Sequence, residues 1–348
     1  MKGCMRKIMI STIVLVVISS YLSACSSQPV KVSATNTAMG TVVQATLYVP
    51  EEEAGSQGIQ AVQEELERLE KECLSWRVED SQVARLNAHA GTSDGVKVSE
   101  ELYQYLEQVW KISNQSHGAL DVTVGKVVRV WDLDTWATLD SVKQQEFLVP
   151  EEAVLQKCLQ DTGYQKVILQ DGKVYLPEDM CLDLGAVGKG IACDRVGDYL
   201  KKQEKIKGAV VSVGGSVVTY GSKSDGSTWN VAITHPREEG QYLGTLSLQG
   251  EWYVSTSGDY ERYVEKDGKR YHHIMNPVNG YPADSGLCSV TILSKNGLTS
   301  DALSTACFVL GTEEGLRLVK EMGVEAIFVT TELEIIMTDG MKKYFKEK

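Results

Sequence analysis

Residues 182–213 have the sequence LDLGAVGKGIACDRVGDYLKKQEKIKGAVVSV, and this stretch decides the fold class. A short β-rich segment, Cys181–Leu184, leads into a turn at Gly185–Gly190 that is rich in glycine and small residues. Glycine tolerates the backbone angles of a tight turn. We predict a helix from about Gly190 to Lys202 directly after the turn, and a second strand at Ala209–Val213.

The segments on both sides of this unit mix strands and helices without regular alternation. Upstream we predict a strand at Thr41–Val49, a helix with the apolar stripe Ile59, Val62, Leu66, Leu69 and Cys73, a helix capped by Ser99 with the stripe Leu102, Leu106, Val109 and Ile112, and strands at Lys166–Leu169 and Lys173–Leu176. Downstream we predict strands at Trp229–Ile233, Thr245–Leu248, Tyr253–Ser257, Arg270–His273, Ser289–Leu293, Ala326–Thr330 and Ile335–Thr338, with helices near Thr299–Leu310 and Glu313–Met322. This order favours an α+β fold in a single large mixed domain over a doubly wound sheet.

The N-terminus has the layout of a bacterial secretory signal. Lys2, Arg6 and Lys7 precede the apolar run Ile8–Leu22, which is too short for a comfortable membrane span. The run ends in Leu-Ser-Ala-Cys25, which resembles the lipobox of bacterial lipoproteins, where a diacylglyceryl group is attached to the cysteine. The alternative is a plain signal peptide or an uncleaved anchor with a chance cysteine.

Three regions follow from this layout. We expect a lipoprotein signal peptide over residues 1–24, the lipidated Cys25 and a polar tether over 25–34, and one folded domain over 35–348. The expected location is the extracytoplasmic face of a bacterial cell membrane, with the protein anchored by lipid at Cys25.

The charge balance argues against nucleic acid as a partner. The full chain has a net charge of −12, and loss of the three basic residues in the signal makes it −15. An acidic protein binds a phosphate backbone poorly. Outside the signal and Cys25, six cysteines remain (Cys73, Cys158, Cys181, Cys193, Cys288 and Cys307). They form no CxxC pair, so we expect buried free thiols, although an even number outside the cytoplasm also permits disulfides.

The turn at Gly185–Gly190 has the ingredients of a phosphate site. Its glycines let backbone N–H groups approach an anion, the following helix N-terminus favours negative charge, and Lys189 adds a cation. The spacing matches neither the dinucleotide fingerprint nor the P-loop. Taken alone, the segment fits a tight structural turn equally well.

Two further segments contain candidate chemistry. The stretch YHHIMNPVNGYP, residues 271–282, places two adjacent histidines at a strand end, and these point to opposite faces. One of them is a candidate base or metal ligand, with packing or a surface position as the alternative. In LTSDALSTA, residues 298–306, helical spacing puts Asp301, Ser304 and Thr305 on one face. Three oxygen side chains there suit Mg²⁺, and a helix cap is the alternative.

Several motifs in one order support a single interpretation. They are MGT (39–41), LSWRVEDS (74–81), GALDVTVG (118–125), LDLGAVGKG (182–190), VGG (213–215), STSGDYER (255–262), HHIMNPVNGYP (272–282) and SDALSTA (300–306). This series resembles the ApbE family of FAD:protein FMN transferases, from about Met39 to the C-terminus. The resemblance implies an ApbE-like, T-fold-like α+β domain. It also implies an enzyme that uses FAD and Mg²⁺, or Mn²⁺, to attach FMN by a phosphoester to a Ser or Thr hydroxyl of an exported acceptor protein, releasing AMP.

The resemblance also implies roles for individual residues. The residues expected to bind FAD are Met39, Trp76, Ala119, Leu120, Asp121, Asp183, Lys189 and Met275. The residues expected to hold the metal are Ala186, through its carbonyl, Asp301, Ser304 and Thr305. His273 and Asp301 are the expected catalytic residues, and Asp194 matches a recurrent acid of the family. The acceptor is expected to contain a segment resembling D-x-x-[ST]-G-A-[ST].

The sequence departs from the family pattern at several positions. Asn276 and Asn279 stand where the family's HxxDPxTG segment has a carboxylate and a threonine. Ser304 replaces a second metal-binding aspartate of some relatives, and Ser216 replaces an asparagine. Two rival functions therefore stay open: an FAD diphosphatase that releases AMP and free FMN, and a lipoprotein that binds flavin without chemistry. Asp259 is an alternative base to His273.

Overall fold

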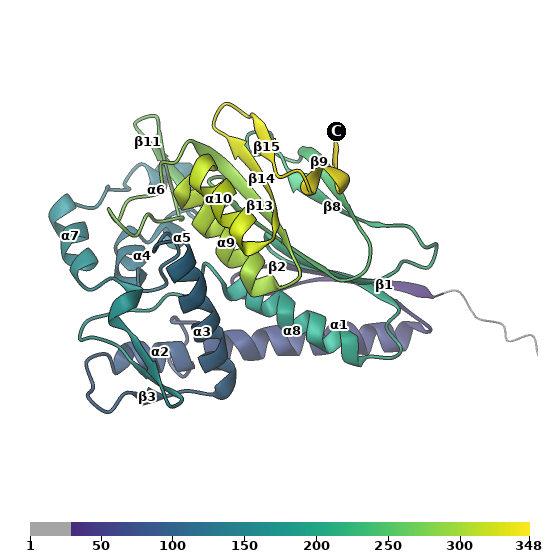
Figure 1. The fold of residues 1–348 in the computed structure, drawn as a ribbon, viewed down its shortest axis with the longest axis horizontal. Helices are drawn as coiled ribbons and strands as arrows, with labels where there is room; N and C mark the ends of the chain where they lie inside the picture. Colours follow the sequence, from purple (N-terminus) through teal and green to yellow (C-terminus); the bar gives the residue numbers. More distant parts are fainter. Residues whose placement is uncertain (1–28) are drawn as a thin grey trace, which may run out of the picture.

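A computed structural model describes residues 29–348, and its centre is an eight-stranded antiparallel sheet (Figure 1). The strands lie in the order β1 (Val30–Ala38), β2 (Thr41–Val49), β6 (Gly208–Val213), β7 (Ser216–Gly221), β10 (Trp252–Gly258), β13 (Leu287–Ser294), β14 (Glu325–Thr330) and β15 (Ile335–Met337). The expected signal peptide and Cys25 lie outside the described residues. Within those residues, no helix is both long enough and apolar enough to cross a membrane.

Three small sheets accompany the large one. They are formed by β16 (Phe345–Glu347), β9 (Tyr242–Leu248) and β8 (Trp229–Thr234), by β3 (Val96–Lys97), β5 (Lys173–Tyr175) and β4 (Ile168–Gln170), and by β11 (Tyr263–Lys266) with β12 (Lys269–His272). The first packs through a separate apolar cluster against one face of the large sheet, where its Trp229 and Leu246 meet Val254 and Val329.

Helices cover the other face of the large sheet. The chain contains α1 (Glu52–Arg68), continued by a π-helical turn at Leu69–Leu74, α2 (Gln82–Ala88), α3 (Glu100–Gln115), α4 (Gly125–Trp131), α5 (Leu133–Trp136), α6 (Ser141–Gln144), α7 (Glu152–Gln160), α8 (Gly188–Lys202), α9 (Gly297–Leu310) and α10 (Thr312–Met322). Helices α1, α8, α9 and α10 pack on the sheet, while α2 to α7 gather beyond its end, on the left of Figure 1. The molecule therefore has an α+β architecture, as predicted.

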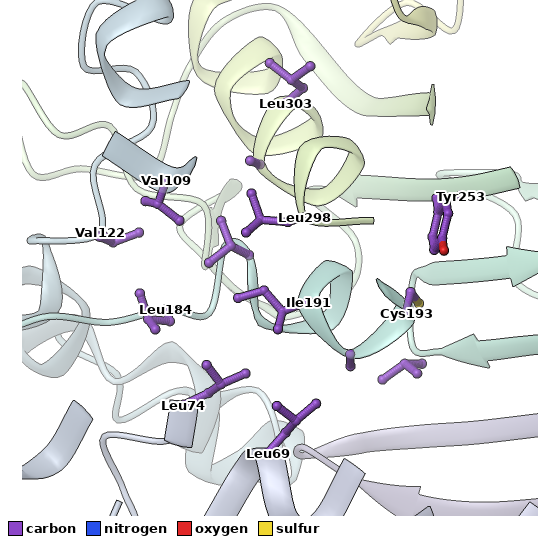
Figure 2. Packing of buried hydrophobic residues seen from close by; sticks show 14 of the residues in the cluster. Leu69, Leu74, Val109, Val122, Leu184, Ile191, Cys193, Tyr253, Leu298 and Leu303 are labelled. Atoms are coloured by element: carbon purple, nitrogen blue, oxygen red, sulfur yellow. The ribbon is translucent and has the colours of Figure 1, made fainter. Parts of the chain in front are cut away.

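A continuous apolar cluster joins the sheet-covering helices to the α2–α7 region. Figure 2 shows Leu69 and Leu74 from the first helical segment converging with Val109, Leu184, Ile191 and Leu298 from four other segments. Both predicted helical stripes are buried, and the Ser99 hydroxyl accepts from the Leu102 N–H as predicted. All six cysteines are buried and unpaired, which confirms the expectation of free thiols.

Helices α2 and α4 to α7 and strands β3, β11 and β16 were not predicted, and three further differences concern segments near the site or the N-terminus. Strand β1 begins at Val30, so residues 30–34, expected in the tether, already pair with β2. The segment Cys181–Leu184 is not a strand, because only Cys181 forms an isolated bridge, to Val124. Strand β7 was not predicted, although its residues Ser216 to Gly221 return directly from β6 through a two-glycine turn. In each case the pairing partner, and not the local pattern, decides the structure.

Candidate active site

The site is built where the N-terminal turns of α8 and α9 meet. Gly190 and Gly297 face each other so closely that a Cβ atom on Gly190 would lie 2.2 Å from the carbonyl oxygen of Gly297. No real Cβ contact is that short, so the crossing requires glycine on α8. The contact brings the glycine-rich turn of the 182–190 segment against the SDALSTA segment, as the phosphate-site and metal-site hypotheses require.

Asp301 points from α9 into this crossing and carries a buried carboxylate. Its Oδ2 accepts from the Gly190 N–H at 2.8 Å, and its Oδ1 accepts from the Ser216 hydroxyl at 3.3 Å. The Lys189 Nζ lies 3.5 Å from Oδ1, and the side chains of Asp301 and Lys189 are only 2% and 19% exposed. A buried carboxylate without donors would be costly, and these three groups offset that cost.

A row of hydroxyl groups lies beside Asp301. The Ser304 hydroxyl donates to the Asp301 carbonyl at 2.8 Å, so the 2.8 Å contact between Ser257 and Ser304 requires Ser257 to donate. The 3.2 Å contact of Ser257 with Thr305 then requires Thr305 to donate. Each hydroxyl has one proton to give. Thr305 therefore keeps both lone pairs free, whereas Ser304 already accepts one hydrogen bond.

The donor set fits a hard divalent cation. Asp301 offers a carboxylate, Thr305 a free hydroxyl oxygen one helical turn later, and Ala186 a carbonyl in the turn before α8. Oxygen donors of this kind, completed by substrate phosphates and water, are typical of Mg²⁺. No group of three His, Cys, Asp or Glu side chains suited to a metal occurs in the described residues, which is consistent with serine at position 304.

The predicted flavin-binding residues line the other side of the glycine-rich turn. The Trp76 indole N–H donates to the Asp183 carboxylate at 2.8 Å, and the Gly185 N–H donates to the same group at 2.7 Å. Burial raises the pKa of Asp183. The Met39 methyl group lies close to Gly188, 3.7 Å from the position of a Cβ on that residue. Met39, Trp76 and Asp183 thus meet around one turn.

The segment 118–125 lies next to Asp183, whose backbone N–H donates to the Val122 carbonyl at 2.7 Å. Ala119 and Leu120 are buried, and the Asp121 carboxylate accepts from Thr123 and from the Tyr164 N–H. The Asp121 carboxylate therefore braces its own turn. Met275 is buried and forms a backbone bridge to Pro282.

The two adjacent histidines have different surroundings, and β12 ends at His272, so the predicted strand end at His273 is one residue too late. The buried His272 ring contacts the Ala283 carbonyl at 3.0 Å and packs against Phe308. The His273 Nδ1 lies 3.3 Å from the Arg262 carbonyl, so Nδ1 holds the proton and Nε2 keeps its lone pair. Burial, followed by the charges of Arg262 and Lys189, holds the pKa of His273 well below its ordinary value. The His273 ring is therefore neutral near neutral pH.

The alternative base and the recurrent acid have other partners. Both Asp259 oxygens accept from Arg237 at 2.7 Å, so this carboxylate is held in a bidentate ion pair. Asp194 accepts from the Gly297 and Leu298 N–H groups at 2.6 and 2.7 Å and caps α9. Burial raises the pKa of Asp194 to about 6. Asp194 therefore positions Asp301 through the helix that bears it.

Sequence reasoning gave no role to three residues of the site. Ser216 contacts Asp301, and Ser257 connects Ser304 with Thr305. Glu261 lies close to Gly215, and burial raises its pKa while Lys189 and Arg262 oppose that shift. Ser216 was noted only as a departure, and the other two lie in the STSGDYER motif, so the motif itself was the available signal.

A family model agrees with this geometry. The model described as "ApbE family" matches residues 39–328. The chain belongs to the ApbE family. The matched range includes every residue that the sequence predicts for the site, from Met39 to Thr305.

Individual ApbE relatives are similar over nearly the whole chain. An FAD:protein FMN transferase of Klebsiella pneumoniae is 33% identical over 312 residues, which cover 88% of this chain and 92% of the relative. The solved ApbE protein of Thermotoga maritima superposes with a TM-score of 0.81 at 30% identity, covering 91% of this chain and all of that one. A flavin transferase ApbE of Vibrio cholerae gives 0.78 at 25% identity, covering 91% and 99%.

Proposed function

We propose that this protein transfers FMN from FAD to a Ser or Thr hydroxyl of an exported acceptor protein and releases AMP. The observation that carries the proposal is the buried Asp301 carboxylate, held at the meeting of two helix N-termini with Lys189 beside it. Such a place suits a pyrophosphate and a cation. The names of the ApbE relatives, FAD:protein FMN transferase, support the same activity.

The residues of the chain divide the work between binding and positioning. Trp76, Asp183 and Met39 bind the flavin end of FAD at the glycine-rich turn. Lys189 and the N–H groups at the start of α8 attract the pyrophosphate. Asp301, Thr305 and the Ala186 carbonyl would hold Mg²⁺, or Mn²⁺, with Ser304 beside them. When bound, the metal would supply positive charge next to the phosphates.

His273 acts as the base in this scheme. The acceptor hydroxyl oxygen attacks the phosphorus on the FMN side of FAD, and the hydroxyl proton passes to Nε2 of His273. A phosphoester bond forms between the acceptor and FMN. The bond from that phosphorus to the bridging oxygen breaks, and AMP leaves with the bridging oxygen. Most of the rate acceleration would come from positioning and electrostatics.

The acceptor and the location form part of the same proposal. The protein would act at the extracytoplasmic face of a bacterial membrane, anchored by lipid at Cys25. Its partner would be an exported protein with a segment resembling D-x-x-[ST]-G-A-[ST], which brings a hydroxyl to His273.

The test is to incubate the mature protein with FAD, Mg²⁺ and such an acceptor domain, and to measure the mass of the acceptor. An increase of one FMN on a Ser or Thr supports the proposal. AMP and free FMN without modified acceptor would show an FAD diphosphatase. Bound flavin without AMP would show a flavin-binding protein and would refute the proposal.

A further inference from the structure

Three arginines lie at one side of the site and are linked through Trp76 and Asp134, of which Arg77 contacts both. The Cζ atoms of Arg77 and Arg129 lie 4.1 and 4.4 Å from the centroid of the Trp76 ring. Asp134 accepts from Arg262 at 2.6 Å and also from Arg77. We call Arg77, Arg129, Arg262 and Asp134 the arginine cluster.

The arginine cluster draws on segments that are far apart in sequence. Trp76 and Arg77 follow the π-helical turn after α1, Arg129 lies in α4, Asp134 lies in α5, and Arg262 lies between β10 and β11. The arginine cluster, with the Trp76 ring that it contacts, borders the site on two sides. Trp76 donates to Asp183 at the glycine-rich turn, and the Arg262 carbonyl contacts His273. A group bound to the arginine cluster would therefore lie next to the proposed base.

The charge of the arginine cluster is opposite to that of the molecule. The chain has 47 acidic and 35 basic residues, yet here two guanidinium groups, those of Arg77 and Arg262, share the Asp134 carboxylate, and a third, that of Arg129, lies over the Trp76 ring. Arg129 is exposed and forms no ion pair with any carboxylate of the described residues. The side chains of Arg77 and Arg262 are 50% and 41% exposed. Such a patch attracts anions in spite of the overall negative field.

Asp134 shows which anion the arginine cluster accepts. Its carboxylate lies between two guanidinium groups, an arrangement that Arg forms readily with carboxylates. Because ion pairs at exposed positions contribute little stability, an incoming carboxylate can replace Asp134 at small cost. Asp134 thus occupies the place of an external acidic group in the free protein.

We propose that the arginine cluster is a docking surface for an acidic segment of the acceptor protein, with Asp134 as an internal competitor for it. This inference rests on the proposed function, because it concerns the partner of that reaction. The acceptor would present Asp or Glu side chains close to its reactive hydroxyl, and their binding to Arg77, Arg129 and Arg262 would bring that hydroxyl to His273.

The test compares three variants in the FMN transfer assay, with the KM for acceptor and the KM for FAD measured separately. Arg129→Gln should raise the KM for acceptor severalfold and leave that for FAD unchanged. Asp134→Asn should lower the KM for acceptor, an improvement that a merely structural role would not produce. Arg317→Gln, which removes an exposed arginine of α10 paired with Glu313 and Glu314, should change neither constant.

Two further measurements complete the test. Acceptor binding to the FAD-free protein should weaken as salt rises, and the Arg129→Gln protein should lose part of this salt dependence. An acceptor with amides in place of the acidic residues near its hydroxyl should bind equally to wild type and Arg129→Gln.

A changed KM for FAD with an unchanged KM for acceptor would overturn the proposal, as would weaker acceptor binding by Asp134→Asn. Failure of the proposed function is distinguishable, because wild type would then leave no flavin on any acceptor, while direct binding still tests the docking surface.

Discussion

Asp301 is the residue on which the proposed chemistry depends most. Its carboxylate is buried, and it is held by a backbone N–H, a serine hydroxyl and the nearby Lys189 ammonium group. These groups fix its orientation before any ligand arrives. The neighbouring hydroxyls differ in their capacity to bind a metal ion. Thr305 retains free lone pairs, whereas the Ser304 hydroxyl is hydrogen-bonded to the Asp301 carbonyl and to Ser257.

Replacement of Asp301 by Asn should lower the rate of FMN transfer by about 100-fold or more, because it removes the charge that holds the metal. The amide keeps the shape of the side chain. Initial rates measured over a range of Mg²⁺ concentrations check this. Asp339→Asn, which removes the charge of an exposed carboxylate paired with Lys342, is the matched control and should retain the activity of the wild type. Equal losses in the two variants would contradict the assignment of the metal ligands.

Replacement of His273 by Gln should lower the transfer rate by about 100- to 10,000-fold, the range for loss of a general base.

The same replacement should change how the free energy of unfolding depends on pH. Because the pKa of His273 is depressed in the folded state, the unfolded state binds more protons as pH falls below the ordinary histidine pKa, and stability is lost there. Urea unfolding at pH 7 and pH 5 should therefore show a larger loss for wild type than for His273→Gln. An equal loss would contradict burial of a neutral ring.

At the scale of elements, the contact between α8 and α9 forms the site. The Gly190 N–H reaches Asp301 across 111 residues of sequence, and Asp194 on α8 caps the start of α9. One helix therefore positions the other at the point where the proposed phosphate and metal sites meet. The N-terminal turns of α8 and α9 are joined by these hydrogen bonds, so the groups on them have fixed positions. A site that stabilises developing charge with preorganised groups needs such fixed positions.

Two of the three glycines of the turn should respond differently to substitution. Gly190→Ala should cost about 3 kcal/mol of unfolding free energy or prevent folding, because its Cβ would overlap the Gly297 carbonyl. Gly188→Ala should be neutral or slightly stabilising, because only the Met39 methyl lies near, at 3.7 Å. Thermal or urea unfolding of both variants measures this. A stable Gly190→Ala protein would show that the helices can separate without harm.

At the scale of the whole molecule, the three layers bury every cysteine of the described domain. Burial raises the pKa of Cys73 and Cys193 and of the other thiols of the core. Thiols of this kind react slowly. A chain that starts after Cys25 should therefore show no fast-reacting thiol when native and six when unfolded. A native protein with rapidly labelled cysteines, or an unfolded one with fewer than six, would contradict the packing.

The sequence predicted local structure well and distant contacts poorly. Helical stripes, the Ser99 cap and the glycine-rich turn follow from spacing and residue type, and the family motifs predicted His273, Asp301 and Lys189 as site residues. The structure brings Asp301 and Lys189 together, while the predicted strand Arg270–His273 ends one residue earlier, at His272. In contrast, Arg262 meets Asp134 across 128 residues, and no local pattern encodes that pairing. Strand β1 and residues Ser216 and Ser257 were missed for the same reason, since their partners come from other segments.

The central claim is that FMN passes from FAD to an acceptor hydroxyl in one step at this site. The most direct measurement counts both products in one reaction of the mature protein with FAD, Mg²⁺ and acceptor. One AMP should form for each FMN-modified acceptor at every time point, and the Asp301→Asn protein should form both products much more slowly than wild type. AMP in clear excess over modified acceptor, accompanied by free FMN, would contradict it.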